Sequence, residues 1–362
     1  MKLLGGTDEG SPGIKLLFAI LGLAVVLSIW IFLTNGSDPI VTHGILPSPM
    51  RVLTAFGDLF NDNELMANVG FSIGLNLSGY LEAILIAIPV GFTIGLFKYT
   101  RWGFQRQVDA IRYIPLTALI GLFIAWFGIG ASMKIHFLAF GILIYLLPVI
   151  VQRIDEVDDV YLKTVHTLGA TDWQTIRTVY LPSVLSRLSD DIRVLTAISW
   201  TYIIVAEMVA SQGGIGNLIY SAGYRQGRID KVFALLVIIM VIGVVQDKIF
   251  VWLDREFFPH KYQAKDAVKT SRLQQKGLAS VIADYSLLAL GWIGIGLYFI
   301  LMVNEFFGFI PGFRPLNYLF GTTVWVFHII VIALIIYKVW KWYQHRTDLI
   351  AMQAFNKQSS RA

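Results

Sequence analysis

The stretch LGATDWQTIRTVYLP, residues 168–182, is polar and lies between apolar segments that are each long enough to cross a bilayer. Gly169 can take the positive φ that ends a helix, and Thr171 and Gln174 have the spacing of a capping box that begins the next one. Leu181-Pro182 is expected to end this second helix, because the residue before a proline avoids the helical conformation. The stretch therefore predicts a short helix–turn–helix outside the hydrocarbon of a membrane protein.

The apolar side chains of Trp173, Ile176 and Val179 need cover if this stretch lies in an aqueous loop. Two arrangements would supply it. The side chains either pack on the chain's own helix ends or dock into a partner subunit.

Composition supports the membrane assignment. Of the 362 residues, 56% are hydrophobic and only 15% are charged, which lies far outside the usage of soluble globular proteins. The net charge of +5 does not indicate nucleic-acid binding, because the basic residues are dispersed over successive loops. The absence of cysteine excludes disulfides and thiolate metal sites. We expect an all-α polytopic membrane protein.

A helix needs about 20 residues to span the hydrocarbon core, and eight apolar windows approach or reach that length. These windows are Ile14–Thr34, Ser72–Phe97, Ala110–Phe127, His136–Val151, Ile192–Val209, Val232–Trp252, Tyr285–Val303 and Leu319–Tyr337. If the amino terminus is cytoplasmic, most lysines and arginines fall in inside loops, which is the usual asymmetry. Both termini are therefore expected in the cytoplasm, with the chain crossing the membrane several times.

Two segments on the outer side are not expected to span. Ser48-Pro49 can begin an amphipathic helix that lies along the outer interface. The second segment is a glycine-rich turn that either gates the outer side or is a plain loop. Its gate candidates are Gly213, Gly214, Gly216 and Asn217.

Several linked motifs resemble one family of transporters. Gly169, followed at fixed spacing by Val179, Leu181 and Pro182, resembles the cytoplasmic signature of ABC importer permeases. The other motifs are LPSP at 46–49, IRYIPLTAL at 111–119, WFGIG at 126–130, VAEM at 205–208 and GGIGNLI at 213–219. Together they are similar to permeases of the nitrate, sulfonate, taurine and bicarbonate importers. Lys163 is a departure, because it stands in the region where the family signature usually begins with glutamate and small residues.

The resemblance implies a domain plan. Residues 1–45 would form an amino-terminal transmembrane helix and outer loop, and residues 46–259 the permease core, which with that first helix makes six spans. Within the core, residues 158–182 would be the cytoplasmic coupling loop. Residues 260–282 form a basic cytoplasmic linker, and residues 283–362 a two-helix membrane extension that the family pattern does not explain.

The resemblance also implies partners. Permeases of this family work as pairs with two cytoplasmic ATPase subunits and an extracytoplasmic substrate-binding protein, and we expect a homodimer here. The sequence has no GxxxxGK[ST] loop, so MgATP would bind only to the partner subunits, and we expect no cofactor in this chain. The coupling loop would transmit ATPase closure to the spans and produce alternating access. Its coupling residues would be Gly169, Ala170, Thr171, Asp172, Trp173, Gln174, Leu181 and Pro182.

Polar residues inside the spans are candidates for the substrate pathway, because such residues are costly in hydrocarbon. They are Asn76, Arg112, Ser199, Trp200, Thr201 and Tyr202. Arg112 either attracts an anion or extends to the inner headgroups. Glu82 and Glu207 would repel an anion, so we expect them to pair with a basic residue or with helix-end amides.

No catalytic or metal site is expected, because the six histidines lack ligand spacing and no nucleophile motif occurs. The two-helix extension either pads the periphery or recruits an additional subunit or the second permease copy. A channel or a receptor-like scaffold is the alternative function, although neither needs the helix–turn–helix. The same permease fold carrying an organic cation, an amino acid or a vitamin precursor is a further alternative.

Overall fold

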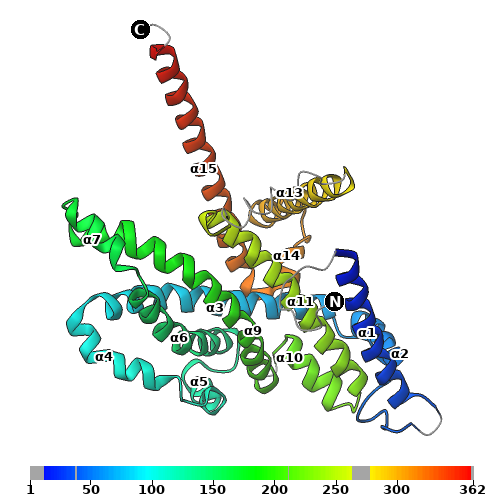
Figure 1. Cartoon of the computed structure of the whole chain (residues 1–362). Coiled ribbons are helices and arrows are strands. Elements are labelled where there is room, and N and C mark those ends of the chain that lie inside the picture. The colour runs from blue at the N-terminus through cyan, green and yellow to red at the C-terminus, as the bar shows by residue number, and fades with distance from the viewer. Residues whose placement is uncertain (1–11, 37–38, 211, 263–277, 360–362) are drawn as a thin grey trace, which may run out of the picture. The chain divides into compact units, whose positions relative to one another are not determined.

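The computed structural model describes residues 12–36, 39–210, 212–262 and 278–359, and all regular structure among them is helical (Figure 1). The helices are α1 (Pro12–Thr34), α2 (Pro49–Asp62), α3 (Leu65–Leu96), α4 (Lys98–Ile111), η1 (Leu116–Leu119), α5 (Ile120–Phe127), α6 (Ala131–Asp155), α7 (Asp159–Thr167), α8 (Asp172–Thr175), η2 (Ile176–Tyr180), α9 (Leu181–Val209), α10 (Ile215–Leu218), η3 (Ile219–Tyr224), α11 (Ile229–Phe257), α13 (Leu278–Phe307), α14 (Pro315–Phe320), η4 (Gly321–Thr323) and α15 (Val324–Ser359). Most of the expected linker, residues 263–277, lies outside the described residues.

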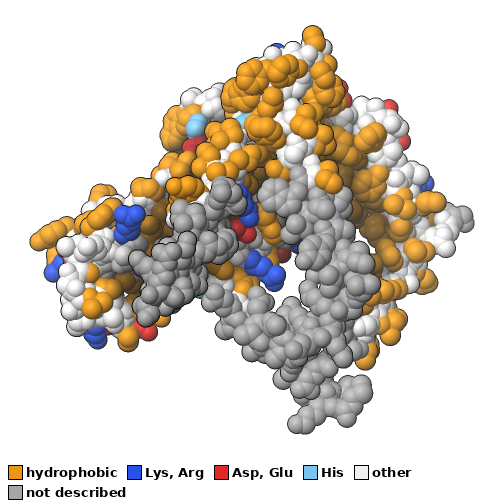
Figure 2. Space-filling model, turned by 90° about the horizontal axis from the view of Figure 1, so that it is seen from above, with side chains coloured by type: hydrophobic (Ala, Val, Ile, Leu, Met, Phe, Trp, Pro, Cys, Tyr) orange, Lys and Arg blue, Asp and Glu red, His pale blue; other side chains and the backbone are white. Residues whose placement is uncertain are grey.

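The expected all-α membrane fold is confirmed. Within the described part of the chain, six helical segments are long and apolar enough to cross a membrane, namely Gly13–Thr34, Leu65–Leu96, Ala131–Asp155, Asp172–Val209, Ile229–Phe257 and Pro315–Trp340. The seventh expected window, Tyr285–Val303, falls in α13, of which Ile293–Phe307 is a shorter apolar stretch. Hydrophobic side chains cover much of the face seen in Figure 2, as lipid contact requires.

The third expected span, Ala110–Phe127, is not one straight helix. The segments Lys98–Ile111 and Leu116–Phe127 meet at an angle of 95°. Pro115 lies in the break, where it lacks a backbone N–H and disfavours a helical conformation for the residue before it. The expectation of a single continuous span was therefore wrong at this proline.

One compact unit consists of residues 1–65 and 217–242. Its helix α1 is apolar on all sides and largely exposed within the chain, as expected of a lipid-facing span. Ser48 caps α2 at the amide of Arg51, and Val52, Ala55 and Leu59 form the buried face of this helix. The predicted amphipathic helix is thus confirmed, while its place at the outer interface stays a prediction.

The other unit consists of residues 66–216 and 243–362. Here α6 and α9 make the most extensive helix pair, and α6 supplies much of the buried core. The extension also packs within this unit. Lys338 of α15 donates from Nζ to Oε1 of Glu256 on α11 over 2.8 Å, and the rings of Tyr337 and Phe257 lie 4.6 Å apart.

Candidate coupling loop and substrate pathway

The first helix of the expected coupling loop forms as the sequence predicts. Asp158 caps α7, because its Oδ1 accepts a hydrogen bond of 2.9 Å from the amide of Val160. The helix stops before Gly169, which has a φ of +78°, and the amide of Ala170 returns to the carbonyl of Val165 over 3.0 Å. A residue with a Cβ is strained at such a φ, so glycine ends the helix here.

The predicted capping box begins the second helix. The hydroxyl of Thr171 accepts from the amide of Gln174, and the side chain of Gln174 accepts from the amide of Thr171 over 2.8 Å. Asp172 follows in the first turn, where a negative charge is favourable near the helix amino terminus. The turn between α7 and α8 is thus fixed by its own local hydrogen bonds.

The expectation that Leu181-Pro182 ends the second helix was wrong. A π-helical turn, η2, joins α8 to α9, so the helix runs without interruption from Asp172 to Val209. The amide of Leu181 donates to the carbonyl of Ile176, five residues back, instead of four. A wider turn of this kind accommodates the proline ring and its missing donor, and the chain enters the span as one helix.

The apolar residues of the loop differ in how far their side chains are exposed. Val179 is buried, whereas Trp173 is 70% exposed. Tyr161 and Leu168 are also exposed, at 61% and 81%. We call Tyr161, Leu168 and Trp173 the coupling surface. Large apolar side chains that a preformed turn leaves uncovered mark a protein–protein contact more often than a self-contained loop.

An ion-pair network fixes the base of the loop. Arg153 on α6 donates to Glu156 over 2.6 Å and to Asp191 on α9 over 2.7 Å. Arg187 donates to the carbonyl of Glu156 over 2.9 Å. The guanidinium of Arg153 holds the pKa of the Glu156 carboxyl below its usual value. Sequence reasoning missed this network, because its members are up to 38 residues apart.

At the other end of α9, a buried carboxylate holds the glycine-rich turn. Glu207 is fully buried, and it accepts hydrogen bonds from the hydroxyl of Ser72 over 2.6 Å and from the amide of Gly216 over 2.8 Å. The hydroxyl of Ser72 also accepts from the amide of Ile215 over 2.8 Å. Helix-end amides therefore pair with Glu207, as expected from the sequence.

Residues 212–216 form what we call the glycine hairpin. Gly213 and Gly214 have φ values of +70° and +99°. Asn68 of α3 accepts from the amide of Gly214 over 2.7 Å, and Lys134 of α6 donates to the carbonyl of Gln212 over 2.9 Å. Two helices of the core thus hold the hairpin through its backbone.

The hairpin contains three of the four gate candidates. These are Gly213, Gly214 and Gly216. Asn217 lies in α10, where its carbonyl accepts a hydrogen bond of 2.7 Å from the hydroxyl of Ser221. The gating role of the four residues stays a prediction.

Three pathway candidates are engaged inside helix contacts. Asn76 donates to the hydroxyl of Ser199 over 2.9 Å, and both side chains are buried. The indole of Trp200 donates to Gln246 on α11 over 2.8 Å. Thr201 is exposed on the other side of α9. The first three residues therefore contribute to packing between helices.

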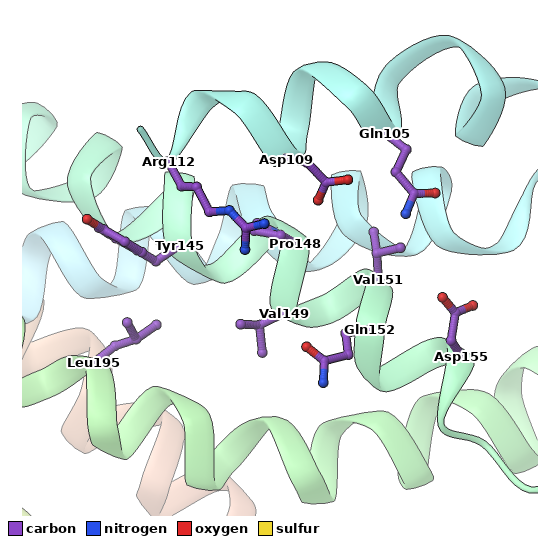
Figure 3. Close-up of a pocket in the computed structure, with 10 residues that line it drawn as sticks. All are labelled: Gln105, Asp109, Arg112, Tyr145, Pro148, Val149, Val151, Gln152, Asp155 and Leu195. Carbon is purple, nitrogen blue, oxygen red and sulfur yellow. The ribbon is translucent and has the colours of Figure 1, made fainter. Parts of the chain in front are cut away.

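Arg112 lies at a cavity, and Tyr202 is connected to the cavity wall through Tyr145. A cavity of about 350 Å³ lies between α4, α6 and α9, and the side chain of Arg112 extends into it from the end of α4 (Figure 3). Tyr145 of α6 lines the same cavity, and its hydroxyl lies 3.4 Å from that of Tyr202. Among the residues that the structure describes, no carboxylate forms an ion pair with Arg112, which contacts the ring of Tyr113. Two carboxylates, Asp109 and Asp155, also line the cavity, and Asp155 forms an ion pair with Arg101.

Sequence reasoning missed the α6 wall of this cavity. Tyr145 and Gln152 are seven residues apart and line it together, with Pro148 between them. That spacing places them on one helix face, so the signal was present in the sequence. The sequence analysis overlooked these two residues because it searched the spans mainly for charged side chains, and tyrosine and glutamine are neutral.

No metal centre accompanies these features. Within the described ranges, no three histidine, aspartate or glutamate side chains are grouped closely enough to hold an ion. His136 instead bonds Glu82, with Nδ1 lying 2.8 Å from Oε1. Glu82, the other carboxylate that the sequence analysis expected to be paired within a span, therefore has a partner.

Comparisons with known proteins fit this arrangement. Residues 83–258 match the family model of the binding-protein-dependent transport system inner membrane component. The putative aliphatic sulfonates transport permease of Escherichia coli is 30% identical over 215 residues, which cover 56% of this chain and 77% of that protein. The chain belongs to this permease family. The match to residues 83–258 contains the coupling surface, the glycine hairpin and the Arg112 cavity.

Two further relatives agree. The putative aliphatic sulfonates transport permease of Bacillus subtilis is 29% identical over 237 residues, covering 64% of this chain and 83% of that protein. The taurine transport system permease of Escherichia coli is 27% identical over 226 residues, covering 61% and 81%. This permease is thus a multi-pass membrane subunit of a binding-protein-dependent ABC transport system. The family match ends at residue 258, before the extension.

Proposed function

We propose that this permease carries a small sulfonate-type anion across the bacterial inner membrane by alternating access, driven by ATP hydrolysis on separate subunits. The coupling surface carries the proposal. It presents Trp173 on a turn that is fixed by its own hydrogen bonds and leads directly into the continuous helix Asp172–Val209. A push on that turn is transmitted to the span, because helix and turn form one rigid element.

The assembly that fits this mechanism has several partners. Two cytoplasmic ATPase subunits, which bind MgATP, would contact the coupling surfaces of two permease copies. An extracytoplasmic binding protein would deliver the substrate. The distribution of basic residues supports a cytoplasmic position for the coupling surface and for both termini. The chain itself would bind no nucleotide and catalyse no reaction.

The Arg112 cavity fits the class of substrate. A guanidinium presents planar donors that match the oxygens of an anionic group. Tyr145 and Gln152 add neutral hydrogen-bond donors, and the carboxylates of Asp109 and Asp155 at the same cavity would keep the binding of an anion weak enough for its release. Relatives named for transport of aliphatic sulfonates and taurine support a sulfonate as the anion.

Purification of the full chain in detergent tests the coupling. We expect an ATPase subunit to copurify. We also expect proteoliposomes supplied with the associated binding protein to take up an alkanesulfonate only when ATP is present on the side of the membrane that carries the ATPase subunits. Uptake that persists without ATP, or recovery of the chain with no ATPase subunit, would instead support a channel.

Substitution of Arg112 tests the anion site. Arg112→Ala is expected to raise the KM for sulfonate uptake up to about fivefold, because an exposed ion pair contributes about 0.2–1 kcal/mol. Arg112→Lys keeps the charge and should have a smaller effect. Arg106→Ala is the matched control, since Arg106 is also exposed on α4 but does not line this cavity. Equal KM values for all three variants would contradict the site.

A further inference from the structure

The extension contacts the permease core through glycines of α3. Gly70 and Gly74 lie one helical turn apart on the same face. A Cβ added to Gly70 would overlap the backbone carbonyl of Leu319 in α14, and one added to Gly74 would overlap the side chain of Thr323 in η4. The backbone of α14 at Gly70 and the side chain of Thr323 at Gly74 therefore approach more closely than a residue with a Cβ would allow.

Such an approach indicates a fixed contact. Helices in a membrane associate through close van der Waals packing of small residues, since the surrounding lipid is as apolar as the side chains. Thr323 is 3% exposed, and its hydroxyl donates to the carbonyl of Phe320 over 2.6 Å. A helix pair that only pads the periphery needs no glycine face on its neighbour.

Phe71 lies between the extension and the glycine hairpin. A Cβ placed on Gly321 would lie 3.4 Å from Cδ2 of the Phe71 ring, and one placed on Gly213 would lie 3.4 Å from Cδ1. These are opposite edges of the ring. The Nζ atom of Lys134, which holds the hairpin at Gln212, lies 5.5 Å from the centre of the same ring. One aromatic side chain thus contacts both segments.

The same turn of α3 holds the hairpin by hydrogen bonds. Asn68 and Ser72 accept from hairpin amides, and they flank Phe71 in the sequence. Gly70 and Gly74, which receive the extension, alternate with them. One short segment, residues 68–74, therefore carries the hairpin on one side and the extension on the other.

We propose that the C-terminal extension braces the glycine hairpin, with Phe71 as the positioning residue between them. The proposal rests on the proposed transport function only where it predicts a change of transport rate. An outer turn that must move during alternating access would then move against α14 and η4. The extension would set how readily this permease opens on that side, without contacting the substrate.

The chain has no cysteine, so a single introduced cysteine is a unique labelling site. Gln212→Cys places a nitroxide spin label on the hairpin at an exposed side chain. In this background, Phe71→Ala removes the link, and Gly74→Leu displaces the extension. Both changes are expected to give a more mobile label, seen as narrower lines in the spectrum. Phe71→Leu, which keeps most of the contact, should restore the original spectrum.

Gly294→Leu is the matched control for Gly74→Leu. It is a glycine of the extension helix α13 with no neighbouring atom within 4 Å of an added Cβ. We expect no change of label mobility for this control. An unchanged spectrum for Phe71→Ala, or equal changes for Gly294→Leu and Gly74→Leu, would overturn the brace. If Gly74→Leu fails to assemble, Phe71→Ala decides alone, because it introduces no clash.

The rate of substrate uptake provides a second test of the brace. Loss of the brace is expected to change Vmax for uptake by about fivefold, the lower end of usual couplings between distant sites, with KM unchanged. A general loss of structure would lower the amount of assembled protein instead. The label spectrum does not depend on transport, so a failure of the proposed function leaves the test of the brace intact.

Discussion

The two ends of α9 carry glycine-containing turns that are built in opposite ways. Before the helix, the coupling loop leaves Trp173 70% exposed. After the helix, the glycine hairpin surrounds Glu207, which is fully buried and accepts from Ser72 and Gly216. The first turn leaves apolar surface uncovered and the second turn pairs its polar groups internally. The difference separates the surface proposed to contact a partner from a turn whose polar groups are satisfied within the chain.

Physical costs explain why this contrast is informative. A buried carboxylate is expensive unless hydrogen bonds replace the lost water, so the donors around Glu207 are part of the stability of the fold. An exposed indole gains nothing from the isolated chain, because its apolar surface stays in water. The free energy of covering Trp173 is therefore available to a partner.

The largest effect on stability is expected for Glu207→Ala. It leaves the buried hydroxyl of Ser72 and the amide of Gly216 without their acceptor. A buried donor left without an acceptor costs about 1–3 kcal/mol, so two of them should lower the free energy of unfolding by about 2–6 kcal/mol. Denaturant unfolding of the purified chain in detergent measures this loss.

Glu82→Ala is the control for that variant. Glu82 is also a carboxylate in a span, but its side chain is 30% exposed and its partner His136 is itself 36% exposed. The expected loss is clearly smaller, because the variant removes one partly exposed contact and leaves no fully buried donor without an acceptor. Equal losses for the two variants would remove the distinction between the sealed hairpin and other polar pairs in the spans.

Trp173→Ala should have the next largest effect, on binding instead of on folding. A central aromatic residue of an interface typically contributes about 2 kcal/mol or more, which is about a 30-fold weaker affinity for the ATPase subunit. Titration of the purified permease with the ATPase subunit measures it. The free energy of unfolding should be unchanged, since the side chain makes little contact within the chain.

Val179→Ala provides the opposite pattern. Val179 is 8% exposed, so its truncation should destabilise the fold and leave the affinity for the ATPase largely intact. If Trp173→Ala unfolds the protein, or if it leaves the affinity for the ATPase subunit unaltered, the exposed indole is not a docking residue.

Sequence predicted those parts of the site that depend on neighbouring residues. The end of α7 at Gly169 and the capping box of Thr171 and Gln174 are confirmed, because both rest on bonds between residues at most a few positions apart. The predicted end of the helix at Pro182 was wrong. A single π turn before the proline shifts the hydrogen-bond pattern by one residue, and the helix continues through it. Local rules do not anticipate such a turn.

For long-range contacts, the sequence predicted at most the type of partner and not its identity. The sequence indicated that Glu207 needs amide donors or a basic partner, but Ser72 is 135 residues away. The close approach of the extension to Gly70 and Gly74 was missed, because two glycines in an apolar window do not identify the segment that packs on them. The bend of 95° at Pro115 was missed, because the apolar window Ala110–Phe127 continues through the proline.

The smallest of the expected effects concerns Thr171→Ala. Loss of a capping side chain costs about 1 kcal/mol of helix stability, and here it frees one side of the turn that presents Trp173. Amide hydrogen exchange should accelerate at Gln174, whose N–H loses its acceptor. Global unfolding should change little, because the box lies outside the buried core.

Thr171→Ser tests the same position with the hydroxyl retained, and it should exchange like the original chain. A modest loss of ATPase affinity for Thr171→Ala alone would show that the turn must be ordered before the partner binds, since the substitution removes no exposed apolar surface. If the alanine variant keeps full affinity while its amides exchange faster, the partner itself orders the turn. The coupling surface would then be formed on binding, unlike the glycine hairpin, which is fixed in the free chain.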